Sequence, residues 1–515
     1  MRIFDTYVQK LKYKVLTELA RQTWVGNDAF SVFNDIANQV VKKGEPTMSC
    51  CIYKDRAIVA ERIRIALGGK KEDHNVIQVI DIACDECPVA GHVVTDLCRG
   101  CVAHACVDAC KLGAITVDSH QKAEIDKSKC VECGKCAKSC PYSAIANFKR
   151  PCEKACKVDA ISMAPDGVAQ IDSEKCIECG ACVYKCPFGA TLDVSSITDI
   201  IKTIVDSDNN KNYHVHAIVA PAIAGQFQYA KAGQLISAIR ELGFYAVEEV
   251  ALGADIVAYK EAQELQEKGF LTSSCCPAFV KYIKMKFPQL AEHISHNLSP
   301  MAETGKLIKE QDPDAKIVFI GPCTAKKGEV RKPEVHQYVD YVMTFEELQA
   351  MIDSKDIAVD QLPETELDTA TYYGRVFART GGLSEAVTEA VREQKAAAEA
   401  AKADAPDGVG ASGAVASGEA GASGKPTSGD GACDGDSADS KPFVFDPIVC
   451  DGIDSCKTAL LRASKGLLPN NFIEGMVCTD GCIGGAACLS HGNADKRAID
   501  NYGKKATHKE IRDVL

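Results

Sequence analysis

The crowding of cysteines into one part of this chain constrains its fold more than any other feature. Sixteen of the 27 cysteines lie between residues 84 and 186 of a 515-residue sequence. Disulfide-rich scaffolds are normally short secreted domains, whereas residues 1–10 mix charges into their apolar positions and lack a signal-peptide pattern. We therefore expect a cytoplasmic protein whose clustered thiols bind metal.

The cysteine-rich block contains an internal repeat. The segment His104–Ile115 is echoed by Arg150–Ile161, and Asp126–Pro141 is echoed by Asp172–Pro187. In both pairs the second copy follows the first by 46 positions, and a fixed period of this size marks duplicated supersecondary units. We predict an α+β ferredoxin-like multi-cluster domain over residues 81–195.

The second half of each repeat has the cysteine spacing of bacterial ferredoxins. Cys130–Pro141 reads Cys-x2-Cys-x2-Cys-x3-Cys-Pro, and Cys176–Pro187 has the same spacing. In this pattern three thiolates bind one [4Fe–4S] cluster and the fourth reaches the neighbouring cluster. Zinc ribbons use pairs of Cys-x2-Cys instead, so the spacing favours iron–sulfur clusters over zinc.

This crossover rule divides the sixteen thiols of the block into four sets. The looser run Cys98–Cys110 completes the first two sets, and the fourth set contains the thiols that remain. Cys84 and Cys87 could equally bind zinc or stay reduced, so we expect three to four accessory [4Fe–4S] clusters. The sets are Cys98, Cys101, Cys106 and Cys140; Cys110, Cys130, Cys133 and Cys136; Cys156, Cys176, Cys179 and Cys182; and Cys84, Cys87, Cys152 and Cys186.

A row of such clusters conducts single electrons, which implies a reaction centre elsewhere in the chain. The sequence after the block has an α/β pattern. Short buried strands are predicted at Tyr213–Ala220, Lys316–Gly321 and Phe443–Cys450, and amphipathic helices at Ala232–Leu242 and Phe345–Ile352.

The chain divides into three regions and one insertion. Residues 1–80 are predicted to be mostly helical, without an assigned role, and residues 210–515 to form the α/β domain. Residues 395–440 are rich in Ala, Gly, Ser and Asp and are predicted to be a disordered insertion. A net charge of −12 and a single Trp argue against nucleic-acid binding, and no apolar run is long enough to span a membrane.

A few isolated cysteines occur in three short segments of the second domain. Leu271–Val280 contains Cys275 and Cys276, Gly321–Glu329 contains Cys323, and Glu474–Gly485 contains Cys478 and Cys482. Taken singly, a buried cysteine is more often a small hydrophobe than a ligand. Each of the three segments is predicted to be a loop beside a helix start, where thiolate is favoured. Four thiols with Pro or Gly neighbours could converge on one cluster: Cys276, Cys323, Cys478 and Cys482.

These three segments resemble the active-site signatures of the [FeFe]-hydrogenases, in the same order along the chain. The resemblance covers residues 210–515 apart from the insertion. It implies a two-lobed α/β catalytic domain behind the ferredoxin-like domain, and a ferredoxin-linked hydrogenase that interconverts protons, electrons and H₂.

The resemblance also implies an H-cluster, which is a [4Fe–4S] cubane joined to a diiron unit carrying CO, cyanide and an azadithiolate bridge. Lys326 matches the lysine that anchors a cyanide ligand, Met476 matches a residue that lines the diiron pocket, and Pro221 falls beside the cofactor. Cys482 matches the thiolate that also reaches the diiron unit. The implied cubane ligands are Cys276, Cys323, Cys478 and Cys482.

A proton route is implied by the same resemblance. Cys275 matches the proton-delivering thiol, Glu261 and Glu264 match two relay carboxylates, and Ser295 matches the hydroxyl between them. The two glutamates are three positions apart and therefore share one face of a helix. Without the resemblance, Glu264 would be taken as part of a solvated helix face and Cys275 as a packing thiol.

Several positions depart from the family pattern. Gly321 stands where Met is usual, Phe279 replaces Trp, and Ala222 stands where a hydroxyl often holds the second cyanide. Met301 replaces Gln, and the pair Ala486–Ala487 replaces glycines. These departures resemble the divergent branch often called group B and leave the implied ligands intact.

The implied partners are a ferredoxin or similar electron carrier and the hydrogenase maturation proteins. A docking surface is predicted over residues 122–157, where nine Lys and Arg residues accompany four Asp and Glu residues. Three alternatives stay open: a hydrogen sensor, a non-catalytic relative that assembles iron–sulfur proteins, and a polyferredoxin. A sensor commonly carries a signalling module, which is not evident here, and a polyferredoxin leaves the three signatures unexplained.

Overall fold

The computed structural model describes residues 4–27, 31–44, 47–49, 51–70, 73, 75–85, 87–88, 90–403 and 443–515. None of the helices in these ranges is long and apolar enough to cross a membrane. Residues 404–440 of the predicted insertion, and Cys433 within them, lie outside the described residues. The predicted start of the insertion at residue 395 is wrong, because an Ala- and Glu-rich helix, α19 (Gly382–Ala403), runs through it.

Three helices form the N-terminal region, which confirms its predicted helical character: α1 (Tyr7–Trp24), α2 (Phe33–Val40) and α3 (Ile52–Ala66). A capping box between Thr6 and Gln9 begins α1. The apolar face of α1, which includes Leu16 and Leu19, is buried in the same core as the helices of the second domain.

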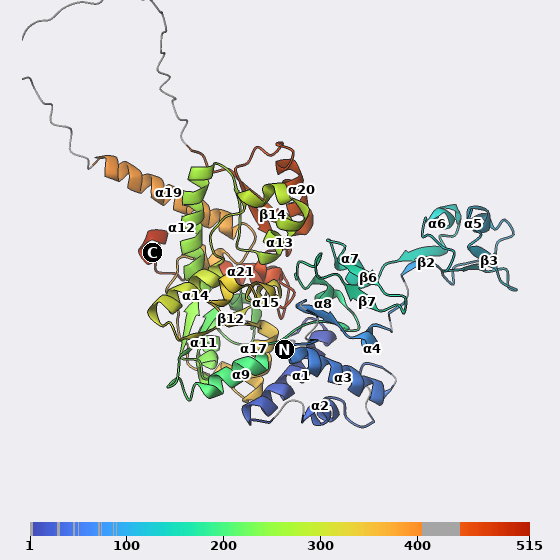
Figure 1. Ribbon diagram of the computed structural model, residues 1–515, viewed down its shortest axis with the longest axis horizontal. Coiled ribbons are helices and arrows are strands. Elements are labelled where there is room, and N and C mark those ends of the chain that lie inside the picture. The colour runs from blue at the N-terminus through green and yellow to red at the C-terminus, as the bar shows by residue number, and fades with distance from the viewer. Residues whose placement is uncertain are drawn as a thin grey trace, which may run out of the picture.

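The cysteine-rich domain is built from two copies of a helix-and-hairpin unit, as the repeat predicts. The first copy forms a lobe that stands apart from the rest of the molecule (Figure 1). It contains β2 (Gly91–Val94), α5 (Ala105–Asp108), β3 (Ile115–Val117), β4 (Ala123–Ile125), α6 (Lys135–Ser139) and β5 (Ile145–Phe148). We call it the distal lobe.

The second copy packs against the body of the protein. It contains α7 (Pro151–Ala155), β6 (Ile161–Met163), β7 (Ala169–Ile171) and α8 (Ala181–Lys185). Its last strand, β8 (Thr191–Asp193), pairs antiparallel with β1 (Ile77–Val79), which is followed by the short helix α4 (Asp81–Cys84). The chain segment before the distal lobe therefore belongs to the second copy in space.

Two parallel sheets form the two lobes of the α/β domain. One has the order β10 (Ala246–Glu249), β9 (Val215–Val219), β12 (Lys316–Gly321) and β13 (Tyr341–Thr344), and the other β11 (Leu271–Thr272), β15 (Phe472–Met476) and β14 (Pro447–Asp451). These strands read as nearly continuous apolar runs because helices cover both faces of such sheets.

The helices of this domain connect successive strands or pack on the sheets (Figure 1). The helices predicted at Ala232–Leu242 and Phe345–Ile352 are present. The strand predicted from Phe443 begins at Pro447, because Phe443 and Phe445 pack instead against a hydrophobic core that includes Phe472 of β15. The helices are α9 (Ile197–Asp206), α10 (Ile223–Gln226), α11 (Ala232–Glu241), α12 (Val250–Lys268), α13 (Pro277–Lys286), α14 (Pro300–Gln311), α15 (Ala325–Glu329), α16 (Pro333–His336), α17 (Phe345–Ser354), α18 (Tyr372–Val376), α20 (Ile453–Ala463) and α21 (Asn493–Gly503), with short 3₁₀ turns at Pro288–His293, Val359–Gln361, Cys482–Gly484 and Ile511–Val514.

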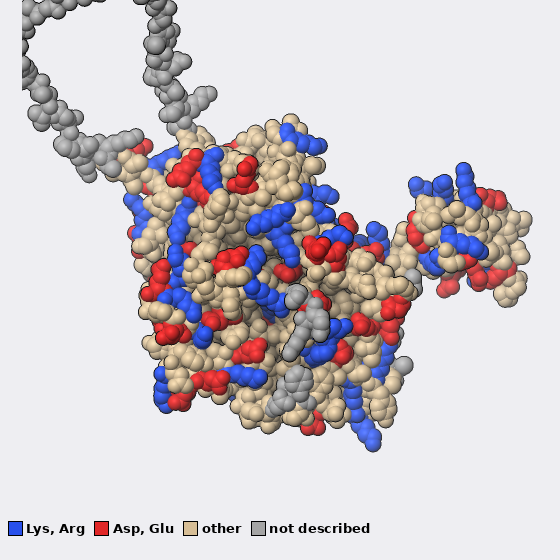
Figure 2. All heavy atoms as spheres, in the orientation of Figure 1, with Lys and Arg blue, Asp and Glu red and all other residues tan. Residues whose placement is uncertain are grey.

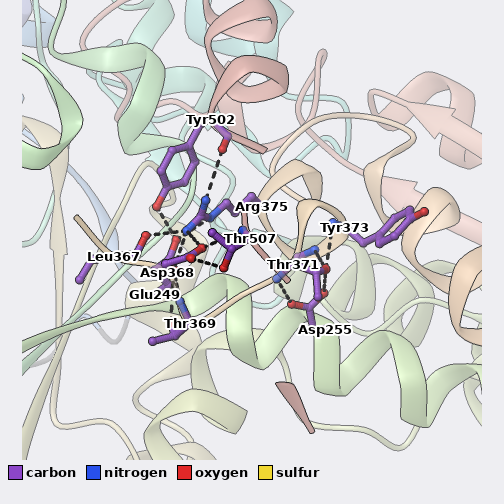
Figure 3. Close-up of polar contacts among 11 residues, drawn as sticks. Glu249, Asp255, Leu367, Asp368, Thr369, Thr371, Tyr373, Arg375, Tyr502 and Thr507 are labelled. Carbon is purple, nitrogen blue, oxygen red and sulfur yellow. Dashed lines mark hydrogen bonds and ion pairs between the residues drawn. The ribbon is translucent and has the colours of Figure 1, made fainter. Parts of the chain in front are cut away.

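A buried arginine fixes α18 against the junction of β10 and α12 (Figure 3). The Arg375 side chain is 1% exposed and donates from Nε and Nη2 to the two carboxylate oxygens of Glu249, at 2.9 and 3.1 Å. The Tyr502 hydroxyl donates to the same carboxylate, and its ring lies 4.5 Å from the guanidinium. Because a buried charge is tolerated only when it is paired, this network holds the three elements in one arrangement.

Candidate metal centre

The carboxyl ends of both parallel sheets meet around one group of thiols. Cys323 follows β12, and Cys276 follows β11 and is the N-cap of α13. Cys478 and Cys482 follow β15. In parallel sheets the loops at this edge carry the functional residues, so the fold delivers four thiols from three distant segments to one place.

Three of these thiols, Cys276, Cys323 and Cys482, line one cavity, and all three interact electrostatically with the fourth, Cys478. Burial, followed by the thiolates of Cys323 and Cys276, raises the pKa of Cys482 to about 12. Burial and the same two neighbours raise the pKa of Cys478 well above its ordinary value. Each of the four is a free thiol. Buried thiols so close together cannot all ionise by themselves, whereas a bound metal cluster would accept all four as thiolates.

A small cavity of about 90 Å³ adjoins these thiols. Its lining is almost entirely apolar and includes Pro221 and Met476, which sequence reasoning placed at the site. Lys326 brings a buried cation to the wall, and its Nζ pairs with Glu329 Oε2 at 2.6 Å. The remaining lining residues are Ala220, Val250, Ala254, Cys275, Cys276, Pro277, Pro300, Met301, Phe319, Pro322, Cys323, Phe377, Ala378 and Cys482.

Sequence reasoning missed several of these lining residues, notably Phe319, Phe377 and Ala378. They carry no reactive group, and no cysteine spacing marks them. Two of the departures from the family pattern have a packing explanation. A Cβ at Gly321 would lie 2.5 Å from the Phe319 ring, and a Cβ at Gly475 would lie 2.2 Å from the Phe279 ring. Aromatic rings thus occupy the space that larger side chains would need.

Cys275 faces the cavity and a buried carboxyl group. Burial, followed by the charge of Glu261, raises its pKa well above the ordinary value. Glu261 is fully buried, and burial raises its pKa to about 7. Its Oε1 accepts from the Ser274 backbone N–H at 3.3 Å, while its Oε2 has no hydrogen-bond partner among the described residues. The Ser274 hydroxyl donates to Oε1 at 3.4 Å, and the Ser295 hydroxyl lies near enough to the Glu261 carboxyl group to moderate its raised pKa.

Ser295 and Glu264 continue from Glu261 toward the surface. The Ser295 hydroxyl donates to Glu264 Oε2 at 3.1 Å. The other oxygen, Oε1, lies 2.7 Å from Lys268 Nζ and 2.7 Å from the ring of His296, whose side chain is 71% exposed. Burial opposes ionisation of Glu264, but hydrogen bonds from Lys268 and His296 outweigh it and lower its pKa.

Eight of the accessory thiols lie in the distal lobe, and those with shifted acidity have neighbouring thiols there. The thiolates of Cys140 and Cys101 add to burial in raising the pKa of Cys106. Cys130 and Cys133 act in the same way on Cys136. Cys98 and Cys110 pack against the core of the distal lobe that contains Cys106 and Cys136.

The third and fourth sets lie closer to the α/β domain. Burial, followed by Cys179, Cys176, Cys156 and Cys152, raises the pKa of Cys182 well above its ordinary value. Cys152 in turn has its pKa raised to about 11 by burial and by neighbours of the fourth set, which are Cys186, Cys84 and Cys87. The two sets therefore adjoin each other.

The last thiol of each run has the same local environment. In all four cases its sulfur accepts a hydrogen bond from the backbone N–H of the alanine four residues later, at 3.3–3.4 Å. Such bonds stabilise anionic sulfur. The four thiols are Cys110, Cys140, Cys156 and Cys186.

Arg150 was counted in the predicted docking surface, and this is wrong. Its side chain is buried because it turns inward to the fourth set, where Nη1 donates to Cys84 Sγ at 3.6 Å and Nη2 to the Cys87 carbonyl at 3.0 Å. Lys127, Lys129 and Lys157 pair with acidic neighbours. The exposed lysines that remain in residues 122–157 are Lys122, Lys135, Lys138, Lys149 and Lys154.

The third set also adjoins the four-thiol centre. Cys323 lies close enough to contribute to the raised pKa of Cys179, which reaches about 12 mainly through burial. The Thr324 hydroxyl donates to the Glu178 carbonyl at 2.7 Å, and a Cβ at Gly180 would lie 2.6 Å from that hydroxyl. The ferredoxin-like loop is thus packed directly on the loop that carries Cys323.

Comparison with protein families gives two matches. Residues 213–486 match the model described as "Iron only hydrogenase large subunit, C-terminal domain". Residues 97–144 and 150–190 match the model described as "4Fe-4S dicluster domain".

Two curated hydrogenases are similar to the chain over about half its length. It is 30% identical over 308 residues to Iron hydrogenase 1 of Clostridium pasteurianum, an alignment covering 54% of this chain and 52% of that protein. It is 29% identical over 277 residues to the periplasmic [Fe] hydrogenase large subunit of Nitratidesulfovibrio vulgaris, covering 49% and 61%. The chain thus spans about half the length of the curated relatives it matches.

Two further similarities are more limited. The cytosolic Fe-S cluster assembly factor NAR1 of Kluyveromyces lactis is 37% identical over 95 residues, which cover 18% of this chain and 20% of that protein. A solved structure of the [FeFe]-hydrogenase HydA1 from Chlamydomonas reinhardtii aligns with 62% of this chain and 92% of its own, at 20% identity and a TM-score of 0.46.

Proposed function

Because this chain belongs to the iron-only hydrogenase family and is an iron–sulfur protein, we propose that it is an [FeFe]-hydrogenase. It would interconvert protons, electrons and H₂ at an H-cluster and exchange electrons with a ferredoxin in the cytoplasm. One observation carries the proposal. Four thiols from three segments lie beside an apolar cavity with the buried Lys326 in its wall.

The donor set fits the implied cofactor. Cysteine thiolates are the usual ligands of iron–sulfur clusters, and Cys276, Cys323, Cys478 and Cys482 would hold the cubane. Lys326 offers a cation to an anionic ligand, and Met476 and Pro221 offer apolar walls that exclude water. When bound, the diiron unit supplies an open Lewis-acidic position with a basic amine beside it.

The residues from Cys275 to Glu264 fit a proton route. Burial keeps the Cys275 thiol protonated, so it can donate a proton and take one back. With a pKa of about 7, Glu261 can hold or release a proton at neutral pH. The Ser295 hydroxyl lies near Glu261 and donates to Glu264, and Glu264 meets His296 at the surface.

The accessory thiol sets fit an electron route with four clusters. The third set lies between the four-thiol centre and the fourth set, and two more sets occupy the distal lobe. The buried Arg150 beside Cys84 and Cys87 supports a negatively charged cluster there. Neutral, reduced thiols would give the positive charge of this arginine no negative charge to balance it in the interior.

A second candidate is an assembly factor of the NAR1 kind, which the local similarity to that protein favours. Such a protein would need no diiron pocket. The combination of Cys275, Lys326 and Met476 around one apolar cavity favours the hydrogenase instead. A hydrogen sensor would have the same pocket and would differ in turning over slowly.

Infrared spectroscopy of anaerobically matured protein tests the proposal. We expect bands of metal-bound CO and cyanide, which disappear in Cys323→Ser and persist in Cys51→Ser, since Cys51 lies outside every thiol set. Iron content should be about 22 atoms per chain with four accessory clusters, or about 18 with three. A matured protein that contains iron but has no such bands would reject the hydrogenase and favour the assembly factor.

A further inference from the structure

A group of metal-ligand side chains lies away from all of the thiol sets. His214 precedes β9, His216 lies on β9, and Asp312 directly follows α14. Their ligand atoms all lie within 4.8 Å of one another. They sit at the amino end of the parallel sheet, whereas Pro221 and Cys323 follow its carboxyl end. The group therefore does not belong to the proposed hydrogenase site.

The geometry of His216 is that of a ligand without its ion. Only 7% of the residue is exposed, and its Nε2 has no hydrogen-bond partner among the described residues. This nitrogen lies 3.9 Å from Asp312 Oδ2. The other ring nitrogen, Nδ1, lies 2.8 Å from Glu248 Oε1. A carboxylate that accepts a hydrogen bond from Nδ1 leaves Nε2 with a free electron pair, which is how metal-bound histidines are commonly oriented.

The side chains of His214 and Asp312 lie next to the Nε2 atom of His216. His214 Nδ1 lies 2.7 Å from Asp312 Oδ2, and the His214 ring stacks on Tyr245 with 3.8 Å between centroids. Lys309 and Lys316, the basic residues on either side of the turn, pair with Asp340 instead. The carboxylates of Asp312 and Glu248 thus surround two imidazoles, an arrangement that a divalent cation would neutralise.

We propose that His214, His216 and Asp312 bind a divalent transition-metal ion of the Zn²⁺ class, with water as a fourth ligand. Two imidazole nitrogens and one carboxylate oxygen form a donor set suited to such ions. Bonds of about 2.0–2.2 Å in a tetrahedral site place ligand atoms about 3.3 Å apart. The distances of 2.7 and 3.9 Å observed here bracket that value, so small side-chain movements admit the ion.

The ion would have a structural role. It would tie the amino end of β9 to the turn after α14, and Pro300 and Met301 at the opposite end of α14 line the cavity of the metal centre. The site is independent of the hydrogenase proposal, since neither Cys275 nor any thiol of the five sets takes part in it.

Zinc binding should be measured on the cluster-containing full chain, prepared anaerobically without an oligohistidine tag. After incubation with Zn²⁺ and desalting, we expect about one zinc per chain more than in Asp312→Asn or His216→Gln. The zinc-edge X-ray absorption spectrum of the wild type should contain nitrogen and oxygen ligands at about 2.0–2.1 Å. The variant His336→Gln, which removes an exposed histidine on α16, should bind as much zinc as the wild type.

Two results would overturn the site. One is equal zinc content in the wild type and both ligand variants. The other is a spectrum dominated by sulfur at about 2.3 Å, which would place the zinc on cysteines. Asp312→Asn is isosteric at a partly exposed position, and unchanged iron–sulfur absorption together with an unchanged unfolding midpoint in chelator would establish that the variant is folded.

Discussion

Glu261 and Glu264 lie one helical turn apart on α12, yet their surroundings give them opposite acidities. Burial raises the pKa of Glu261 to about 7, whereas Lys268 and His296 lower that of Glu264 in spite of its partial burial. One carboxyl group can thus be protonated at neutral pH while its neighbour stays ionised. The two carboxyl groups can therefore play different parts in proton transfer between the surface and Cys275, and their spacing in the sequence does not predict this difference.

Replacing the Cys275 thiol should interrupt turnover without removing the cofactor. In Cys275→Ser and Cys275→Ala we expect H₂ production to fall by roughly 100-fold or more, because positioned proton transfer contributes about that much. The CO and cyanide infrared bands should remain, since Cys275 is outside the cubane ligand set. Cys450→Ser, which alters a buried thiol outside the proton route, serves as the control. Unchanged turnover in Cys275→Ser would refute the role.

Glu261→Gln should raise stability at alkaline pH while it lowers turnover. The folded-state pKa of about 7 lies above the ordinary glutamate pKa of 4.5. Between these two pH values the folded protein holds a proton that the unfolded protein has released, so its stability falls as pH rises through this range. Removing the ionisable group should therefore stabilise the protein by up to roughly 3 kcal/mol at pH 8 and by nothing at pH 4. Urea unfolding at the two pH values measures this difference.

Glu264→Gln is the matched control for Glu261→Gln. The pKa of Glu264 is lowered in the folded protein, so its ionised form contributes stability above its unfolded pKa, and that stability is lost as pH falls. The Gln substitution here should destabilise at pH 8. If both variants changed stability in the same direction at pH 8, the assignment of the two carboxyl groups would be wrong.

At the scale of elements, α1 is attached to the rest of the molecule by a buried ion network. Lys12 Nζ lies 2.5 Å from Asp193 of β8 and 2.7 Å from Glu346 of α17. Lys327 of α15 completes the network through Asp193 and Glu347. A helix from the N-terminal region, a strand of the cysteine-rich domain and two helices of the α/β domain are therefore joined by charges that water does not screen.

Lys12→Met should destabilise the protein by about 3 kcal/mol, because it leaves Glu346 buried without its cation. The loss should appear as a lower midpoint in urea, followed by circular dichroism. Lys10→Met changes an exposed position on the same helix and should have little effect. Adding Glu346→Gln to Lys12→Met should recover part of the lost free energy of unfolding. If the double variant lost more free energy of unfolding than the two single variants lose together, this explanation would be contradicted.

For the whole molecule, the position of the distal lobe fits electron entry. Figure 2 shows both basic and acidic side chains on this lobe, and α6 carries the exposed Lys135 and Lys138 shortly after the exposed Cys133 in the chain. The lobe projects from the body, so a small acidic electron carrier could reach its clusters without contacting the catalytic domain (Figure 1).

The variant Lys135→Glu/Lys138→Glu should raise the KM for a small ferredoxin roughly three- to tenfold at low ionic strength, since rim charges act on association. Added salt should reduce the difference. The rate with a small artificial reductant should not change, and Lys496→Glu/Arg497→Glu on α21 is the control. A wild-type ferredoxin rate that does not depend on ionic strength would argue against docking at this surface.

Much of the site could be predicted because its information is local in sequence. The spacing of Cys130 to Cys140, repeated 46 positions later, is typical of cluster-binding loops. Thiols three or four residues apart in such a loop lie close enough together to bind neighbouring clusters. Likewise, Glu261 and Glu264 share a helix face by the helical period alone. These features depend on backbone geometry over a few residues.

Only the tertiary structure decided the features that depend on contacts between distant segments. Arg150 belongs to a basic run in the sequence, but the folded chain turns it inward against Cys84 and Cys87. Phe319 replaces the bulk missing at Gly321, and His214, His216 and Asp312 come together from β9 and the end of α14, almost one hundred positions apart. The sequence determined which ligand types the chain carries. Burial and charge, which set how those groups behave, depend on neighbours that only folding brings together.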